Sequence, residues 1–168
     1  LSSGSYFLYR LGERSTLIDG RLEVYGEKIL VDSVLELEDP QRFLALARRH
    51  DIDTAILDIS TLPRTIAALA ARRDWRPVYY DSGFAVFVRS TPETAAQLDE
   101  LALDFASDPP PQSEAPAFDA PPDWLAGIFP RVPDASDQKQ LGYLYLLVGA
   151  DERARDPFAA GLALVPDD

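Results

Sequence analysis

A proline-rich stretch limits how this 168-residue chain can fold more than any other feature of the sequence. Residues 108–122 contain six prolines and few large apolar residues. Proline fixes φ and lacks a backbone donor, so this stretch can join neither a helix nor a central strand. The sequence therefore predicts three segments: an α/β domain at 1–106, an acidic proline-rich linker at 107–122 and a helical tail at 123–168.

The first segment alternates between strand and helix signals. Apolar runs at 16–18 and 54–59 indicate strands, and the second run is continuous enough to predict a strand covered on both faces. Residues 39–47 and 61–69 begin with helix-start signals and continue with apolar residues at helical spacing. A glycine turn inside 78–88 predicts a β-hairpin. We therefore predict an α/β fold: a small, mostly parallel sheet of about four strands, an antiparallel edge hairpin and flanking helices.

The tail is predicted to form a C-terminal helical hairpin. Its spacing resembles one tetratricopeptide repeat, in which small residues let two helices approach closely and large ones fill the gap. The positions that carry this resemblance are Leu141, Gly142, Tyr145, Gly149, Ala154, Phe158 and Pro166. The pattern departs at Gly161 and at Pro157, which would kink the second helix or delay its start. One repeat cannot bury its own face, so the pair either packs on the α/β domain or begins an array.

The charge of the chain is unevenly distributed. The formal net charge is -12, of which residues 1–91 contribute -1 and residues 92–168 contribute -11. Binding to nucleic acid requires a basic stripe, and no such stripe is visible. We therefore expect no nucleic-acid partner. We also expect no basic patch suited to a membrane surface.

Several chemistries lack their usual signatures. Cysteine is absent from the sequence, which removes disulfides, thiolate metal sites and cysteine nucleophiles. Neither a glycine-rich phosphate loop nor a serine nucleophile elbow is present, and the single His50 has no partner at ligand spacing. The expectation is no cofactor, no metal and no catalytic residue in this segment, with His50 serving as a structural helix-end residue.

Asp19, Arg21 and Tyr25 are the strongest candidates for a ligand site. They lie in and after a polar Asp-Gly-Arg turn that follows a predicted strand, where α/β sheets bind ligands. Arginine can hold a phosphate or carboxylate through two parallel hydrogen bonds. The competing interpretation is structural: Asp19 caps a helix, Arg21 pairs with it and Tyr25 packs.

Asp58 is a further candidate, because it lies near the carboxyl end of the strand predicted at 54–59. Asp53 lies at the start of the same strand. At about 3.3 Å per residue the two carboxylates are too far apart to act as an acid/base pair. Asp58 is therefore considered only as a ligand-binding residue.

Two blocks in the front half resemble a known family. They are Asp-Gly-Arg…Tyr-Gly at 19–26 and Asp-Trp-Arg…Tyr-Tyr-Asp…Val-Phe-Val-Arg at 74–89, supported by 4–11 and 53–58. Together these resemble the soluble C-terminal domain of bacterial polytopic membrane proteins related to GT-C glycosyltransferases, which use polyprenyl-phosphate sugars. The resemblance implies a domain on the extracytoplasmic side of a bacterial membrane, attached to membrane helices. It also implies that the catalytic acid of such a parent enzyme lies outside this chain.

Three hypotheses follow from the sequence. The first is a non-catalytic extracytoplasmic domain of a GT-C-like membrane protein that assists acceptor binding or assembly. The second is a protein-interaction module that docks a partner through the helical tail. The third is a small enzyme acting on a phosphorylated or carboxylated ligand through Asp19 and Arg21. The chain lacks methionine and begins at Leu1, from which we expect a fragment of a larger protein.

Overall fold

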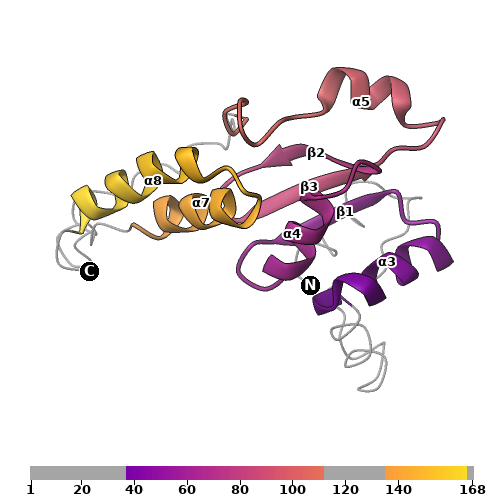
Figure 1. Ribbon diagram of the computed structural model, residues 1–168, viewed down its shortest axis with the longest axis horizontal. Helices are drawn as coiled ribbons and strands as arrows, with labels where there is room; N and C mark the ends of the chain where they lie inside the picture. Colours follow the sequence, from indigo (N-terminus) through magenta and orange to yellow (C-terminus); the bar gives the residue numbers. More distant parts are fainter. Residues whose placement is uncertain (1–36, 112–134, 166–168) are drawn as a thin grey trace, which may run out of the picture.

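A computed structural model describes residues 37–111 and 135–165, and Figure 1 shows how their elements are arranged. Five helices and three strands form within these residues. In chain order they are α3 (Pro40–Arg49), β1 (Thr54–Asp58), α4 (Pro63–Ala70), β2 (Trp75–Tyr80), β3 (Phe84–Arg89), α5 (Ala95–Leu101), α7 (Ser136–Leu147) and α8 (Asp151–Leu164).

Helix α3 begins where its sequence predicts. The carboxylate of Asp39 accepts hydrogen bonds from the backbone N–H groups of Gln41 (2.9 Å) and Arg42 (3.3 Å), and Pro40 occupies the first turn. These contacts satisfy N–H groups that a helix start leaves without intrahelical partners. The inner face of α3 then buries Phe43, Leu44, Leu46 and Ala47.

The sheet differs from the predicted one. It has three strands in the order β1-β3-β2, and both pairings are antiparallel, so the predicted mostly parallel sheet of about four strands is wrong. Strands β1 and β2 do run in the same direction, as expected for strands joined by a helix, because each is antiparallel to β3. The return strand of the hairpin lies between them and replaces the parallel pairing. Ile56 on β1 is 36% exposed, so this strand is not covered on both faces.

The β2–β3 hairpin closes at Asp81. Its carboxylate accepts hydrogen bonds from the N–H groups of Gly83 (2.7 Å) and Phe84 (2.8 Å), which fixes the turn. Farther along β2 the register shifts between Pro77 and Tyr79. Strict alternation from Trp75 would turn Tyr79 toward the core, but this bulge turns Tyr80 inward instead.

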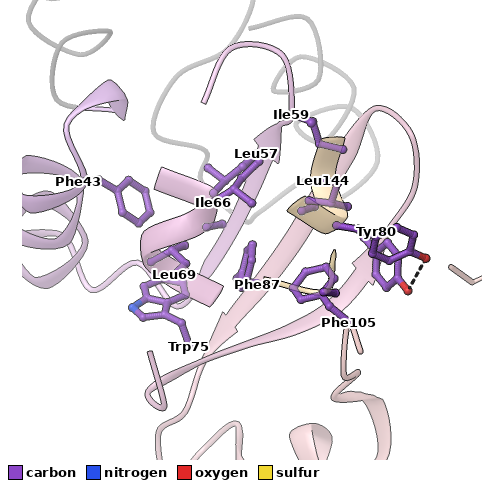
Figure 2. Close-up of a cluster of buried hydrophobic side chains, with 14 of the residues drawn as sticks. Phe43, Leu57, Ile59, Ile66, Leu69, Trp75, Tyr80, Phe87, Phe105 and Leu144 are labelled. Carbon is purple, nitrogen blue, oxygen red and sulfur yellow. Dashed lines mark hydrogen bonds between the residues drawn. The ribbon is translucent and has the colours of Figure 1, made fainter. Parts of the chain in front are cut away.

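The core extends from the sheet into the C-terminal helices. Figure 2 shows Phe43, Leu69 and Trp75 on one side of this buried cluster and Tyr80, Phe105 and Leu144 on the other. Leu144 of α7 is completely buried, as are Ile66 of α4 and Phe87 of β3. Of the two alternatives for the tail, the structure shows the pair α7–α8 packed on the body formed by the sheet, α3 and α4.

Helices α7 and α8 approach closely at Gly142. A Cβ atom at this position would lie 2.8 Å from Cε1 of Phe158, so the ring occupies space that only glycine leaves open. Helix α8 begins at Asp151 and includes Pro157, so this proline does not delay the start of the helix.

Candidate functional site

The structure locates one of the four ligand-site residues predicted from the sequence. Asp19, Arg21 and Tyr25 lie outside the described residues, so their grouping stays a prediction. Asp58 is described and ends strand β1.

Asp58 organises the connection from β1 to α4. Its Oδ1 atom accepts hydrogen bonds from the N–H and hydroxyl of Ser60 (2.8 and 2.5 Å) and from the N–H of Thr61 (3.1 Å). Burial acts to raise the pKa of this carboxyl, but the Ser60 and Thr61 hydrogen bonds together outweigh it and lower the pKa below 3.8. The N-cap of α4, Leu62, makes no side-chain cap hydrogen bond, and Asp58 instead fixes the turn at Ser60 and Thr61 that leads into this helix. A ligand role for Asp58 stays a prediction.

The most connected polar cluster involves three residues that the sequence analysis did not bring together as a site: Tyr80 on β2, Tyr145 on α7 and Arg153 on α8. The hydroxyl oxygens of Tyr80 and Tyr145 lie 3.3 Å apart, and the contact is drawn as a dashed line beside Tyr80 in Figure 2. The two rings meet edge-on, with centroids 6.0 Å apart, an arrangement that aromatic pairs favour.

Arg153 connects this cluster to the segment that follows α5. Its Nη1 donates a 3.0 Å hydrogen bond to the carbonyl oxygen of Phe105 and another hydrogen bond to that of Asp108. The guanidinium carbon also lies 4.7 Å from the centroid of the Tyr145 ring, a cation–π distance. The hydroxyl of Tyr80 donates to the same carbonyl of Asp108, so two donors share this acceptor. Edge strand, loop and both C-terminal helices therefore meet at one point.

The electrostatics of this cluster favour a neutral tyrosine. Burial, followed by the neighbouring Tyr145 hydroxyl, raises the pKa of Tyr80 above its ordinary value of 10.0, although Arg153 acts in the opposite direction. A phenol that is harder to ionise is a poor base or nucleophile at neutral pH. The guanidinium of Arg153 in turn donates to backbone carbonyls and stacks on a ring. The arrangement therefore holds α8 to the sheet and positions the segment at Phe105 and Asp108 that follows α5.

Sequence reasoning missed the cluster because its members come from three distant segments. Tyr145 is part of the repeat-like pattern and Tyr80 of the predicted hairpin, but nothing local in the sequence relates them. The inward orientation of Tyr80 depends on the bulge between Pro77 and Tyr79. No residue pattern in β2 predicts this bulge. Arg153 gave no signal, since one arginine on an amphipathic helix is ordinary.

Other polar side chains in the described segments have local roles. His50 ends α3 as expected, and its Nε2 accepts a 3.1 Å hydrogen bond from Arg49. Arg72 donates to both carboxylate oxygens of Asp74 at 2.7 and 2.8 Å. Within residues 37–111 and 135–165 no group of three or more His, Cys, Asp or Glu is placed to hold a metal ion.

Comparison with known proteins gives no relative for this chain. No protein-family model, no curated protein and no solved structure matches it significantly. Among the helices that the structure describes, none is both long and apolar enough to cross a membrane.

Proposed function

We propose that this chain is a non-catalytic extracytoplasmic domain of a GT-C-like membrane protein, in which it assists acceptor binding or assembly. The family assignment is supported by the two sequence blocks at 19–26 and 74–89. The second block forms the β2–β3 hairpin of the sheet. The proposed family rests on this sequence resemblance alone, whereas the proposed non-catalytic role is argued from the contacts of the polar side chains.

One observation carries the non-catalytic role. The best-connected polar groups in the described segments are engaged in holding the fold together: Arg153 with the carbonyls of Phe105 and Asp108, and Tyr80 with Tyr145. Asp58 is likewise engaged with its own turn. Groups used in this way position elements rather than reacting groups, which suits a domain that presents surfaces to other molecules.

The first experiment reads the coding DNA on both sides of this segment and locates its membrane topology. Several upstream runs of about 20 apolar residues are expected for an attached bundle of membrane helices. A reporter fused after Asp168 in the full protein should be active only on the extracytoplasmic side. A reporter active in the cytoplasm, or a coding region without such runs, would overturn the proposal.

A protein-interaction role through the helical pair is the second candidate function. It is favoured by large apolar side chains that α7 and α8 leave exposed while they pack on the body. These are Tyr143, Leu146, Leu162 and Leu164. Tyr143 and Leu146 are three residues apart on α7 and therefore share one face of that helix. Exposed apolar side chains that lie together on one face mark surfaces that receive a partner.

The interaction role is tested with paired surface variants. In a pull-down with the immobilised chain as bait, Leu146→Glu and Leu162→Glu should each abolish capture of a partner protein that the parent chain captures. Leu101→Glu, which changes a similarly exposed leucine on α5, is the matched control and should retain that partner. Equal retention by all three variants would exclude the helical pair as the binding surface.

A further inference from the structure

Folding brings six arginines from separate segments to one end of the molecule. They are Arg48 and Arg49 at the end of α3, Arg72 and Arg73 after α4, Arg76 on β2, and Arg89 at the end of β3. In the sequence these residues are separated by other segments, so a search for a basic run does not find them. We call this group the arginine end.

Backbone contacts fix the segments of the arginine end beside one another. The N–H of Arg89 donates to the carbonyl of Asp53 at 2.7 Å, and the N–H of Ser90 donates to that of Asp74 at 2.8 Å. Trp75 pairs with Arg89 across the sheet, and its ring lies 5.9 Å from that of Phe43 on α3. The start of β2, the end of β3 and helix α3 are thus held together by the sheet and the core.

Acidic residues compensate only part of this charge. Asp74 forms a close pair with Arg72 and is also attracted by the charge of Arg48. Arg89 and Asp51 are 3.9 Å apart, with the Asp51 side chain almost fully exposed. Asp53 accepts a 2.9 Å hydrogen bond from the hydroxyl of Thr54. Three acids, Asp51, Asp53 and Asp74, thus accompany the six arginines, and the exposed Glu93 follows four residues after Arg89 in the chain. The guanidiniums of Arg48, Arg73 and Arg76 belong to exposed residues.

The opposite end of the molecule is acidic. Figure 1 places the α7–α8 pair at one end of the long axis and the end of α3 with the start of β2 at the other. The α7–α8 end contains Asp137, Asp151, Glu152 and Asp156, with Asp81 in the hairpin turn beside it, against Lys139, Arg153 and Arg155. Its described residues therefore carry a small net negative charge. Such an asymmetry orients a protein in the field of a charged surface, with its cationic end toward the negative charge.

We propose that the arginine end docks on the surface of a membrane that contains anionic phospholipids. A guanidinium binds a phosphate through two parallel hydrogen bonds, and a lipid surface presents many phosphates side by side to guanidiniums from several segments. The Debye length is about 8 Å at physiological ionic strength, so the acidic end on the far side is screened from that surface. The proposal rests on these arginines alone and does not depend on the GT-C assignment.

Two other anionic partners fit the structure less well. A nucleic acid extends beyond a small patch and would meet the acidic remainder of a chain with a net charge of -12. A second copy would have to offer its acidic end, where carboxylates already accept hydrogen bonds. Asp81 accepts from Gly83 and Phe84, and Asp137 accepts from Ser82 at 3.0 Å.

The test is co-sedimentation of the full chain with vesicles of phosphatidylcholine or of an equal mixture of phosphatidylcholine and phosphatidylglycerol. Binding is expected to the mixed vesicles only, and to weaken strongly in about 1 M salt, where the Debye length is about 3 Å. The triple variant Arg48→Gln, Arg73→Gln, Arg76→Gln should partition about 100-fold more weakly, since each of the three basic residues at such a surface contributes about fivefold.

A matched triple variant separates the arginine end from net charge. Arg42→Gln, Arg64→Gln and Arg155→Gln remove the same charge from exposed positions elsewhere and should leave partitioning within about twofold. Equal losses in both triples, or equal binding to both kinds of vesicle, would overturn the proposal. Two other results would also overturn the proposal. One is tighter binding to a single-stranded oligonucleotide than to the mixed vesicles, if the first triple variant abolishes it. The other is salt-sensitive oligomers in ultracentrifugation that the first triple variant abolishes. Arg73→Glu alone serves as a second variant of the arginine end and should also weaken partitioning. Circular dichroism checks that every variant keeps the parent's fold.

Discussion

The hydroxyl oxygens of Tyr80 and Tyr145 lie 3.3 Å apart, and this contact joins the edge strand β2 to helix α7 inside the buried core. Arg153 closes the same cluster from α8 through the carbonyls of Phe105 and Asp108. A network of this kind stabilises a fold when its members satisfy one another, and removing one member leaves buried partners without a hydrogen bond. The attachment of the C-terminal helices should therefore depend on a few side chains.

Replacing Tyr80 with phenylalanine tests the central hydroxyl. The ring would keep its contacts with Phe105 and Tyr145. The hydrogen bond that the Tyr80 hydroxyl donates to the carbonyl oxygen of Asp108 would be lost. We expect the free energy of unfolding, measured by urea denaturation, to fall by about 1–2 kcal/mol. Tyr143→Phe, at an exposed position on α7, is the control and should change it by less than about 0.5 kcal/mol. Equal effects would mean that the hydroxyl of Tyr80 contributes nothing to stability.

Alkaline pH should act on the same group. Because the folded state raises the pKa of Tyr80 above 10.0, the unfolded chain loses this proton first. The contribution to stability is complete below pH 10.0 and is lost as pH rises through the folded-state pKa. We expect the free energy of unfolding of the parent to decrease as pH rises above 10.0, and that of Tyr80→Phe to decrease less steeply. Parallel pH profiles for the two proteins would contradict the assignment.

Arg153→Met removes the guanidinium and keeps most of the apolar stem. The carbonyls of Phe105 and Asp108 lose a charged donor, so we expect a loss of about 2 kcal/mol in the free energy of unfolding. Hydrogen exchange should accelerate in α8 and in residues 102–108, because their attachment weakens. Arg155→Met changes an exposed arginine on the same helix and should leave both measurements near those of the parent. The idea fails if exchange accelerates only in α8, since the loop would then not depend on Arg153.

Local signals in the sequence predicted several elements but not their pairing. The Asp39-Pro40 start of α3 and the Asp81-Ser82-Gly83 turn act within a few residues, and both appear in the structure as predicted. The order of strands depends on which edge of the β2–β3 hairpin receives β1, a choice made by core packing between distant segments. An apolar run at 54–59 is compatible with either a parallel or an antiparallel neighbour, and β1 pairs with β3.

The polar cluster and the arginine end were beyond sequence reasoning for a related cause. Tyr80 turns inward only because of the bulge in β2. The arginines share one end of the molecule only because the sheet and the core bring together the end of α3, the start of β2 and the end of β3. Asp58 could be located at a strand end from the sequence, and its contacts with Ser60 and Thr61 emerge from the turn geometry.

Asp58→Ala tests this turn. Loss of the acceptor for Ser60 and Thr61 should lower the free energy of unfolding by about 1 kcal/mol at neutral pH. Because folding lowers the pKa of Asp58 below 3.8, its contribution is present above that pH and is lost as pH falls through the folded-state pKa. The difference between the parent and Asp58→Ala should therefore shrink on acidification. A difference that stayed constant down to pH 2 would assign the loss to packing instead.

Two buried glycines in the helical pair should respond to alanine with opposite signs. Alanine in a helix interior is favoured over glycine by about 1 kcal/mol. At Gly161 a Cβ atom would meet its nearest neighbours at 3.5 Å or more, an ordinary contact, so Gly161→Ala should stabilise the chain. At Gly142 the same atom would lie 2.8–3.0 Å from three ring carbons of Phe158. Overpacking of this kind costs about 1–3 kcal/mol, so Gly142→Ala should destabilise it.

The partner ring provides the decisive control for this pair. In a Phe158→Ala background the ring is gone, so adding Gly142→Ala should raise the free energy of unfolding, as Gly161→Ala does in the parent. The double-mutant cycle then yields a coupling energy of about 1–3 kcal/mol between positions 142 and 158. No coupling is expected between positions 161 and 158, because the neighbours of a Cβ at Gly161 come from α7 and the residue before it. If Gly142→Ala remained destabilising without the ring, the closeness of α7 and α8 would have to be set by the backbone and not by Phe158.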